Sequence, residues 1–380
     1  MAYTELATDL QKTKWRNEYW DEYVRMSGYK PYMSSSPNAI ITVSRELIDG
    51  GKDLIIPLFG SLKGKGTGAG LLTGGEEKLA NYPFRTRPVW RRNAVVVKKS
   101  TLAQSELNVL QANKDSLKIW SADDMQDRIG EALSVVAFDD TRYDEDTGAQ
   151  NGVPFAEANA TQKNNWLTDN YNRALFGVTQ GNTVAGNFAS SLATVDITAD
   201  KWSAAMLVAA KNMARKRDRV AGRRGVRPWK NGDNGKEMFV FLCDTETFEV
   251  LSNDADIKAF NKDSIERSQD TNPYFQSGDL MWKGIIIHEV PELGATTNLG
   301  AVGASSCVVT MGYLCGAQAL VVGWGQDPKS TRRMDDDYQF INGVGTEELR
   351  SVDKTFFKET GAAGPGTQHG VVTVFGAISA

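Results

Sequence analysis

The segment 53–97 has the most distinctive pattern of apolar and polar positions in the chain. An apolar run at 54–59 leads into a polar tip rich in glycine, and a second run at 83–97 leads back. Two such runs joined by a polar turn predict a long hairpin. Most of the surface of this hairpin would have nothing in its own chain to pack against. We therefore predict that it reaches onto another molecule.

Residues 1–36 predict an N-terminal arm that carries an aromatic helix. Aromatic residues recur there about every four positions, which places them on one face of a helix. This face is formed by Trp15, Tyr19, Trp20 and Tyr23. A short helix is only marginally stable alone in water. We therefore expect the face to dock either on the rest of its own chain or on a neighbouring subunit.

The centre of the chain predicts one long helix followed by a polar region. Apolar residues fall close to helical spacing and indicate a helix within 105–138. Residues 139–195 are rich in Asn, Asp, Gly and Thr, and a shorter helix is predicted at 164–175. The polar region is too long to be plain loop in a compact domain.

Residues 198–330 predict an α/β domain. We expect helices at 198–221, 245–252 and 257–267, with a helical turn at 312–318. We expect strands at 238–243, 284–290, 307–311 and 319–324. The rest of the chain is rich in predicted strands, at 338–343, 347–357 and 370–377. Together these elements predict an α+β fold.

Composition is that of an ordinary globular protein. The chain has 380 residues, of which 41% are hydrophobic and 24% charged, and its net charge is −4. This balance argues against a polycation built for nucleic acid. The N-terminus lacks the pattern of a signal peptide, and no run of about 18 apolar residues exists. We therefore expect a protein made in a cytoplasm with no membrane partner.

Cysteine and histidine usage argues against metal or cofactor chemistry. Cys243, Cys307 and Cys315 fit no CxxC pattern and sit in apolar surroundings, as expected for buried free thiols. His288 and His369 lie far apart, which gives little support to a zinc site or a histidine-based triad. We expect no metal, no cofactor and no catalytic residues.

The glycine-rich tip resembles a phosphate-binding loop only superficially. Its lysines are Lys63 and Lys65, and glycines alternate at 64, 66, 68 and 70. Gly60 and Gly64 enclose three residues where the phosphate-loop pattern needs four, and a glycine follows Lys65 where Ser or Thr should hold the metal. We interpret the tip as mobile chain that becomes ordered on a partner.

Two basic stretches are candidates for contacts between molecules. On the returning strand, Arg85, Arg87 and Arg91 surround Trp90 and form either a solvated face or pairs with carboxylates of the next subunit. A basic loop at 215–236 could contact nucleic acid non-specifically, or could be a solvated or inter-subunit face. Its candidate residues are Arg215, Arg217, Arg223, Arg224, Arg227 and Trp229.

Several blocks of sequence resemble one known family. The segment 272–290, NPYFQSGDLMWKGIIIHEV, resembles a motif of the major capsid proteins of tailed double-stranded DNA bacteriophages, in the N-four-like branch of the podophages. The further blocks are LIIPLFGSLKGKGTGAGLLTGGEE, RALFG, GKEMFVFLCDTETFEVLSND, GYLCGAQALVVGWG, VGTEELRSVDKTFF and HGVVTVFGAIS. They follow the family order and span most of residues 45–380, so their collinearity carries the resemblance.

The resemblance implies the α+β fold of tailed-phage and herpesvirus capsid proteins. It implies an N-terminal arm and entry strand at 1–50 and an extended β-hairpin loop at 51–100. It also implies a peripheral domain with a long spine helix at 101–195 and an axial α/β domain at 196–330. The strands at 331–380 would return to the peripheral domain.

The function that the resemblance implies is structural. Copies of the chain would assemble as pentamers and hexamers into an icosahedral virion capsid around packaged double-stranded DNA, in the cytoplasm of the host bacterium. The shell would touch this DNA only non-specifically. A separate scaffolding protein and a portal protein are expected partners, with a decoration protein as a further candidate.

Two other functions stay open from the sequence. An encapsulin-like bacterial compartment would use the same fold to hold a cargo enzyme. An enzyme would have to use His288 and Glu289 with the acidic triplet at 335–337. A histidine in an apolar strand is more often a core residue with satisfied hydrogen bonds, and an acidic triplet is more often a solvated turn.

Overall fold

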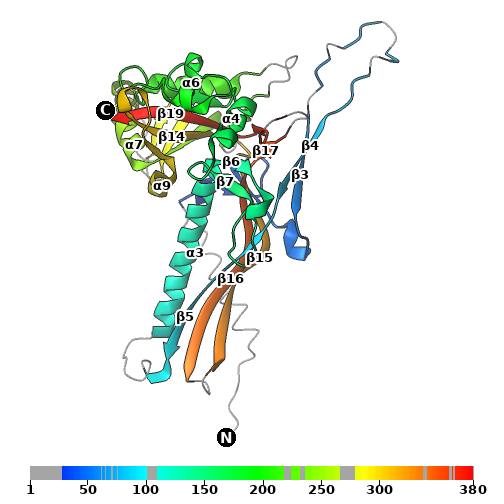
Figure 1. Cartoon of the computed structure of the whole chain (residues 1–380), viewed down its shortest axis with the longest axis vertical. Coiled ribbons are helices and arrows are strands. Elements are labelled where there is room, and N and C mark those ends of the chain that lie inside the picture. The colour runs from blue at the N-terminus through cyan, green and yellow to red at the C-terminus, as the bar shows by residue number, and fades with distance from the viewer. Residues whose placement is uncertain are drawn as a thin grey trace.

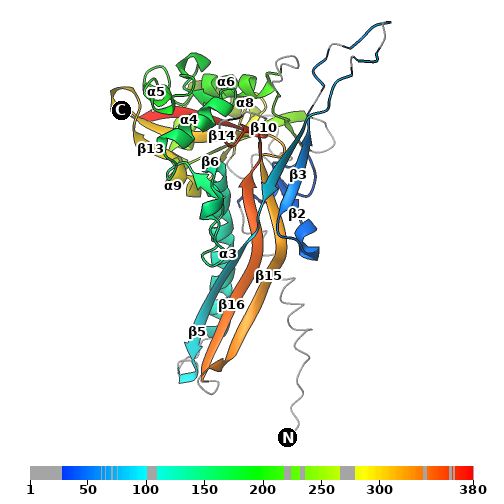
Figure 2. The same cartoon turned by 45° about the vertical axis from the view of Figure 1, so that its right-hand side comes forward.

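The protein has a long, narrow part built on a five-stranded sheet and a wider part built on an eight-stranded sheet (Figure 1). The computed structural model describes residues 28–60, 62–64, 66–69, 72–74, 76–100, 109–217, 224–231, 236–265, 279–336, 340–358, 362 and 364–379. A long helix lies along the first sheet, and shorter helices surround the second. A two-stranded hairpin leaves the molecule beside both parts (Figure 2).

The five-stranded sheet has the order β1-β2-β15-β16-β5. Its strands are β1 (Met33–Ser34), β2 (Ile41–Ser44), β15 (Leu320–Asp336), β16 (Ile341–Lys354) and β5 (Val89–Lys98). β15 and β16 form a long antiparallel pair, and β5 pairs antiparallel with β16 on its other side. β2 runs parallel to β15, which ties the start of the described chain to a strand far along the sequence.

The helix α3 (Val109–Ser134) lies along this sheet and packs against β16 and β5. Met125, Ile129 and Leu133 recur every four residues and are fully buried, because that spacing places them on one face of a helix. The prediction of one long helix within 105–138 is confirmed over the described residues.

The eight-stranded sheet has the order β11-β12-β10-β14-β19-β8, with β13 paired to β14 and β9 paired to β10. Its strands are β8 (Ala174–Phe176), β9 (Trp229–Asn231), β10 (Lys236–Cys243), β11 (Leu280–Trp282), β12 (Ile285–Glu289), β13 (Asn298–Ala301), β14 (Val308–Cys315) and β19 (Val371–Ser379). β10 and β12 run parallel, and Phe239, Val240 and Ile286 are buried although successive residues face opposite sides. A strand covered on both faces is apolar without alternation, so the apolar runs at 238–243 and 284–290 predicted these strands correctly.

Helices pack around this sheet. They are α4 (Ala160–Asp169), α5 (Phe188–Leu192), α6 (Ala204–Arg215), α7 (Thr245–Ser252), α8 (Ala255–Ile265) and α9 (Gly294–Thr297). α7 occupies the predicted range, because Asp244 caps its first turn by accepting a hydrogen bond from the Thr247 N–H over 3.2 Å. The helix predicted at 164–175 is α4, which starts earlier at an Asn159 cap and ends at Asp169.

Aromatic side chains fill the core where β19 meets β8. Phe375 of β19 stacks on Phe176 of β8 with ring centres 4.5 Å apart, and Phe188 and Trp166 pack edge-on against Phe375. β19 therefore lies between β14 and β8, inside the eight-stranded sheet. The sequence division at 331–380 grouped this strand with β16, whereas the structure places the two strands in different sheets.

The hairpin consists of β3 (Leu54–Phe59) and β4 (Asn81–Thr86), paired from Leu54 opposite Thr86 to Phe59 opposite Asn81. The chain between the strands projects away from the body (Figure 1). The apolar run at 83–97 is split, because its second part forms β5 in the five-stranded sheet. The two smaller pairs are β6 (Val135–Phe138) with β7 (Gly152–Pro154) and β17 (Phe356–Phe357) with β18 (Thr367–Gln368).

The prediction of a helical turn at 312–318 was wrong. β14 continues to Cys315 and pairs with β19 over this stretch. Gly312 in this stretch is small because neighbouring side chains pack closely against the strand. A Cβ on Gly312 would lie 2.3 Å from the Phe241 ring. Glycine in a strand often marks such a close approach.

Candidate inter-subunit surfaces

The hairpin carries apolar side chains that its own chain leaves exposed. Along β3, Leu54 is buried at the root, whereas Ile55 and Phe59 are 60% and 61% exposed. The tip adds three leucines that are between 50% and 61% exposed, Leu62, Leu72 and Leu79. An exposed apolar surface of this kind marks a contact with another molecule.

Glu77 closes the tip of the hairpin. Its carboxylate accepts hydrogen bonds from the backbone N–H groups of Lys63 and Gly64, the latter over 2.7 Å. The Lys63 side chain is exposed. Lys65, which was predicted together with Lys63 as a contact residue, lies outside the described residues.

Arginines at the hairpin root pair with carboxylates of the same chain. Arg87 Nε lies 2.8 Å from Asp53 Oδ1, and its guanidinium lies 4.5 Å from the centre of the Tyr143 ring. Arg85 Nη2 lies 3.1 Å from Asp140 Oδ2. The sequence predicted that these arginines either form a solvated face or pair with carboxylates of a neighbouring subunit. In the structure, Arg85 and Arg87 pair with carboxylates of their own chain, and these pairs hold the hairpin root to the body.

A partly buried ion network joins α3 to β5 and β16. Asp124 of α3 accepts hydrogen bonds from Arg91 of β5 and Arg350 of β16. Arg350 Nη1 also lies 2.8 Å from Glu348 Oε1. Burial alone would raise the pKa of Asp124, but the hydrogen bond from Arg91 and the charge of Arg350 hold that pKa below its usual value. Burial raises the pKa of Glu348 to about 7 against the opposing charge of Arg350.

β16 carries two more buried charged groups, neither of which has an ion-pair partner among the residues described. Asp353 accepts a hydrogen bond from Thr86 at the hairpin root, and burial raises its pKa to about 6. Lys354 Nζ donates to the Leu133 carbonyl at the end of α3 over 2.7 Å, and burial lowers its pKa to about 7. Successive residues of a strand point to opposite faces, so the two groups tie β16 to the hairpin and to α3.

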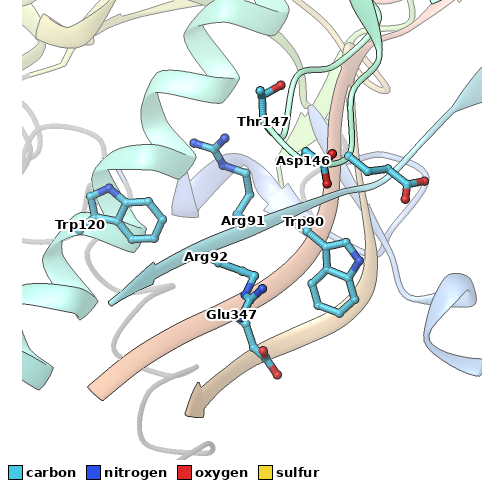
Figure 3. A pocket seen from close by; sticks show the side chains of 8 residues that line it. Trp90, Arg91, Arg92, Trp120, Asp146, Thr147 and Glu347 are labelled. Carbon is cyan, nitrogen blue, oxygen red and sulfur yellow. The ribbon is translucent and has the colours of Figure 1, made fainter. Parts of the chain in front are cut away.

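A pocket of about 500 Å³ lies beside this joint, along the edge strand β5 (Figure 3). Arg91 and α3 lie on one side of that strand, and Trp90 and Arg92 lie on the other. Trp120 of α3 and Trp90 of β5 flank it, and Trp90 is 37% exposed. The rest of its lining is polar or charged and consists of Arg91, Arg92, Glu145, Asp146, Thr147 and Glu347. Tryptophan beside exposed charges is typical of a protein-binding surface.

The basic segment divides into an exposed part and a part that contacts the hairpin. Arg215 and Arg217 are exposed, and Arg215 lies 3.6 Å from Glu237. Arg224 is half-buried, with its guanidinium 4.5 Å from the centre of the Tyr82 ring on β4. Arg223 lies outside the described residues, as do Trp15, Tyr19, Trp20 and Tyr23 of the arm.

Trp229 and His288 both pack against Tyr32, whereas Arg227 is exposed. The ring centre of Tyr32 lies 5.9 Å from that of Trp229 and 5.3 Å from that of His288. His288 Nδ1 lies 2.7 Å from Asp279 Oδ1. The histidine thus has the partners of a core residue, and the side chains of the acidic triplet at 335–337 lie outside the described residues.

In the described part of the chain, the His, Cys, Asp and Glu side chains form no group of three or more that could hold a metal ion. The helices of the same part include none that is long and apolar enough to cross a membrane.

The sequence identified Trp90 and Arg91 as candidate contact residues, but it did not identify the other residues of the pocket and of the ion network. It gave Trp120, Glu348 and Arg350 no role in either. The available signal was the density of charge in the strand predicted at 347–357, because a charged group in a covered strand needs a partner. The partner itself, Asp124, cannot be identified without the packing of α3 on β16.

Similarity to known proteins separates the functions that the sequence left open. The phage capsid protein family matches residues 4–380. The capsid subunit of cyanophage Pam1 is 29% identical, with a TM-score of 0.78 and 100% of each chain covered. The capsid of Ralstonia phage GP4 is 18% identical, with a TM-score of 0.71 and coverage of 100% of this chain and 95% of that one. The acid-stable capsid of Helicobacter pylori bacteriophage KHP30 is 12% identical, with a TM-score of 0.60 and coverage of 92% and 91%. No curated protein matches the sequence.

The family match covers almost the whole chain, and the similar structures named above are phage capsids with the predicted α+β fold. These matches give no support to an encapsulin-like compartment, and the family is structural rather than enzymatic. The chain therefore belongs to the phage capsid protein family and is a structural protein of the virion shell.

Proposed function

We propose that neighbouring subunits interlock when the hairpin tip of one copy enters the pocket between Trp90 and Trp120 of the next. The observation that carries the proposal is the exposure of apolar side chains on both surfaces. The tip leucines are exposed to solvent, and the Trp90 side chain on the body of the subunit is also exposed. A contact between copies would bury both sets together.

Charge on the two surfaces is complementary. The exposed carboxylates of Glu145 and Asp146 line the pocket, and the hairpin tip offers the exposed amino groups of Lys63 and Lys78. Arg92 in the pocket could in turn meet the exposed Glu76 of the tip. Such pairs select the partner and the register more than they add affinity.

The apolar part supplies most of the contact energy. Burying one leucine side chain contributes about 1.5–3 kcal/mol, and tryptophan is among the residues that dominate interface energies. Each contact in a closed shell is repeated by every copy. A modest pairwise affinity is therefore enough to hold the assembly.

We further propose that the shell consists of pentamers and hexamers, forms an icosahedron in the host cytoplasm, and encloses packaged double-stranded DNA. A separate scaffolding protein, a portal protein and a decoration protein are the proposed partners. Membership of the capsid family supports these assignments. Exposed Arg215 and Arg217 would supply the non-specific contact with phosphate groups.

The test is assembly of pocket variants, followed by electron microscopy and sedimentation. We expect Trp90→Ser to give folded subunits that form few or no particles. Val96→Ser is the control, because Val96 is exposed on the same face of β5 but does not line the pocket. Normal particles from Trp90→Ser would contradict the proposed pocket.

A charge exchange sharpens the test. Lys63→Glu combined with Lys78→Glu should impair assembly, because the two new carboxylates of the tip would be repelled by the carboxylates of the pocket. Adding Glu145→Lys and Asp146→Lys should restore particles, since every subunit presents both surfaces. Failure of the added changes to restore assembly would show that the tip and this pocket do not meet.

A further inference from the structure

The end of the basic segment is built firmly into the body of the subunit. The N–H of Val226 donates to the Ala214 carbonyl near the end of α6 over 2.7 Å, and the Val226 side chain is buried. The N–H of Ala317 donates to the Arg227 carbonyl over 2.8 Å. The segment is therefore fixed both to α6 and to the turn that follows β14.

Arg224 extends from this fixed segment to the hairpin. Its carbonyl accepts a hydrogen bond from Nη2 of Arg173, a buried residue that precedes β8. Its guanidinium lies over the Tyr82 ring, 4.5 Å from the ring centre. The main chain of Arg224 thus belongs to the eight-stranded part of the molecule, and its side chain contacts β4.

Tyr82 lies near the end of the hairpin strands that is farther from the root. It pairs with Leu58, one position from the Phe59–Asn81 pair where the two strands end. The root contacts of Arg85, Thr86 and Arg87 lie toward the opposite end of β4. The hairpin is therefore held at two separate points along its length, which fixes its direction as well as its origin.

We propose that Arg224 is a positioning residue that sets the direction in which the hairpin leaves the body, through the contact of its guanidinium with the Tyr82 ring. This inference rests on the proposed function, in which that direction decides whether the tip reaches the neighbouring pocket. It also divides the basic segment by role. Arg224 acts within the subunit, whereas Arg215, Arg217 and Arg227 are exposed among the described residues of the segment and are available to an external partner.

A guanidinium on an aromatic face is a contact of moderate strength. Its loss should shift the ratio of held to released hairpins by roughly 2- to 30-fold. The subunit should stay folded, because the root contacts and the eight-stranded sheet do not depend on this pair.

The direct test measures the direction of the hairpin in unassembled, full-length subunits. Spin labels are placed at Leu62→Cys on the tip and Glu249→Cys on α7, both exposed positions. The native cysteines are buried and should remain unlabelled. The distance distribution between the labels is then compared for Arg224→Gln, Tyr82→Leu, Tyr82→Phe and Arg217→Gln, with thermal unfolding as the check on folding.

We expect one narrow distribution in the parent protein. Tyr82→Phe should keep it, because phenylalanine preserves the aromatic face, and Arg217→Gln should keep it as the matched loss of an exposed cation. Arg224→Gln and Tyr82→Leu should each broaden or displace it without changing the unfolding temperature by more than a few degrees. Distributions that stay unchanged in both of these variants would overturn the inference.

Particle assembly by the same variants separates this inference from the proposed function. A changed distance distribution together with loss of particles supports both. A changed distribution with normal particles supports Arg224 as a positioning residue. It contradicts the proposal that the hairpin is the main contact between subunits, here called the clasp. Loss of particles with an unchanged distribution contradicts the positioning role, because Arg224 would then act directly on another molecule.

Discussion

Asp124 of α3 and Arg350 of β16 form an ion pair in which Arg350 is buried and Asp124 is partly buried, and the same carboxylate also binds Arg91 of β5. One acidic residue of the helix therefore compensates cations from two neighbouring strands. A buried charge that loses its partner does not regain the hydration it lost on folding. The joint between the long helix and its sheet should depend strongly on this one carboxylate.

The first prediction concerns that carboxylate. We expect Asp124→Asn to lower the free energy of unfolding by about 3 kcal/mol or more, because it removes the charge that Arg91 and Arg350 share. Urea denaturation of unassembled subunits measures the change. Asp123→Asn is the matched control, because the adjacent Asp123 is exposed. This change should alter the free energy of unfolding by no more than about 0.5 kcal/mol. Similar effects of the two changes would contradict the assigned role.

The second prediction follows from the raised pKa of Glu348. Burial raises the pKa of Glu348 from its ordinary value of 4.5 to about 7 in the folded state. The resulting stabilisation is complete below the unfolded pKa and is lost as the pH rises through the folded pKa. We expect unfolding free energies measured at a series of pH values to fall across this window, and Glu348→Gln to flatten the fall. Glu347→Gln, on the same strand but only half-buried, should leave the slope unchanged; a parallel loss of slope would refute the assignment.

The third prediction uses Lys354, whose pKa burial lowers from 10.5 to about 7. A lowered lysine pKa gives stability that is present above the unfolded pKa and is lost as the pH falls through the folded pKa. We therefore expect stability to decline from about pH 10 to about pH 7, and Lys354→Met to remove this decline. At neutral pH the change should be neutral or stabilising, because an apolar side chain of similar length replaces a buried cation.

The measurement is the unfolding temperature as a function of pH. Lys358→Met is the control, because Lys358 is exposed and its loss should leave the pH profile intact. Marked destabilisation of Lys354→Met at every pH would instead show that the bond to the Leu133 carbonyl matters more than burial of the charge.

The fourth prediction concerns the hairpin tip. Deleting residues 63–75 should leave a folded subunit that fails to close stable shells, because the deletion removes the exposed Lys63 and Leu72 and shortens the hairpin tip. Thermal unfolding checks the fold, and electron microscopy counts the particles. Gly68→Ala should assemble normally, since an added methyl group there meets nothing within 4 Å. Normal particles from the deletion would show that the tip is not the main clasp.

The sequence predicted the elements whose signals are local. α7 follows from its Asp244 cap, and α3 follows from apolar residues at helical spacing. The helix predicted at 198–221 is shorter at both ends, because α6 spans Ala204–Arg215. Trp202 lies before the helix and donates a hydrogen bond from its Nε1 to Thr310 Oγ1 of β14 over 2.8 Å.

The features that decide the surfaces are non-local, and the sequence could not reveal them. From the sequence alone, the charged residues of β16 are typical of a solvated strand, whereas in the structure α3 packs against that strand. Arg87 was predicted to lie on a solvated face or to pair with a carboxylate of the next subunit, and nothing in the local pattern shows that Asp53 lies across the hairpin root. The contact between Arg224 and Tyr82 joins two segments far apart in sequence, so only the fold reveals it.

The position of β19 has a consequence for the synthesis of this protein. β8 and its aromatic cluster emerge early from the ribosome, but the strand that covers them, Val371–Ser379, is translated much later. Chains that stop before this strand keep Phe176 and Phe188 without their central partner, Phe375. Such fragments expose apolar surface and are prone to aggregation and proteolysis. A prematurely terminated chain therefore lacks the finished sheet that a shell subunit needs.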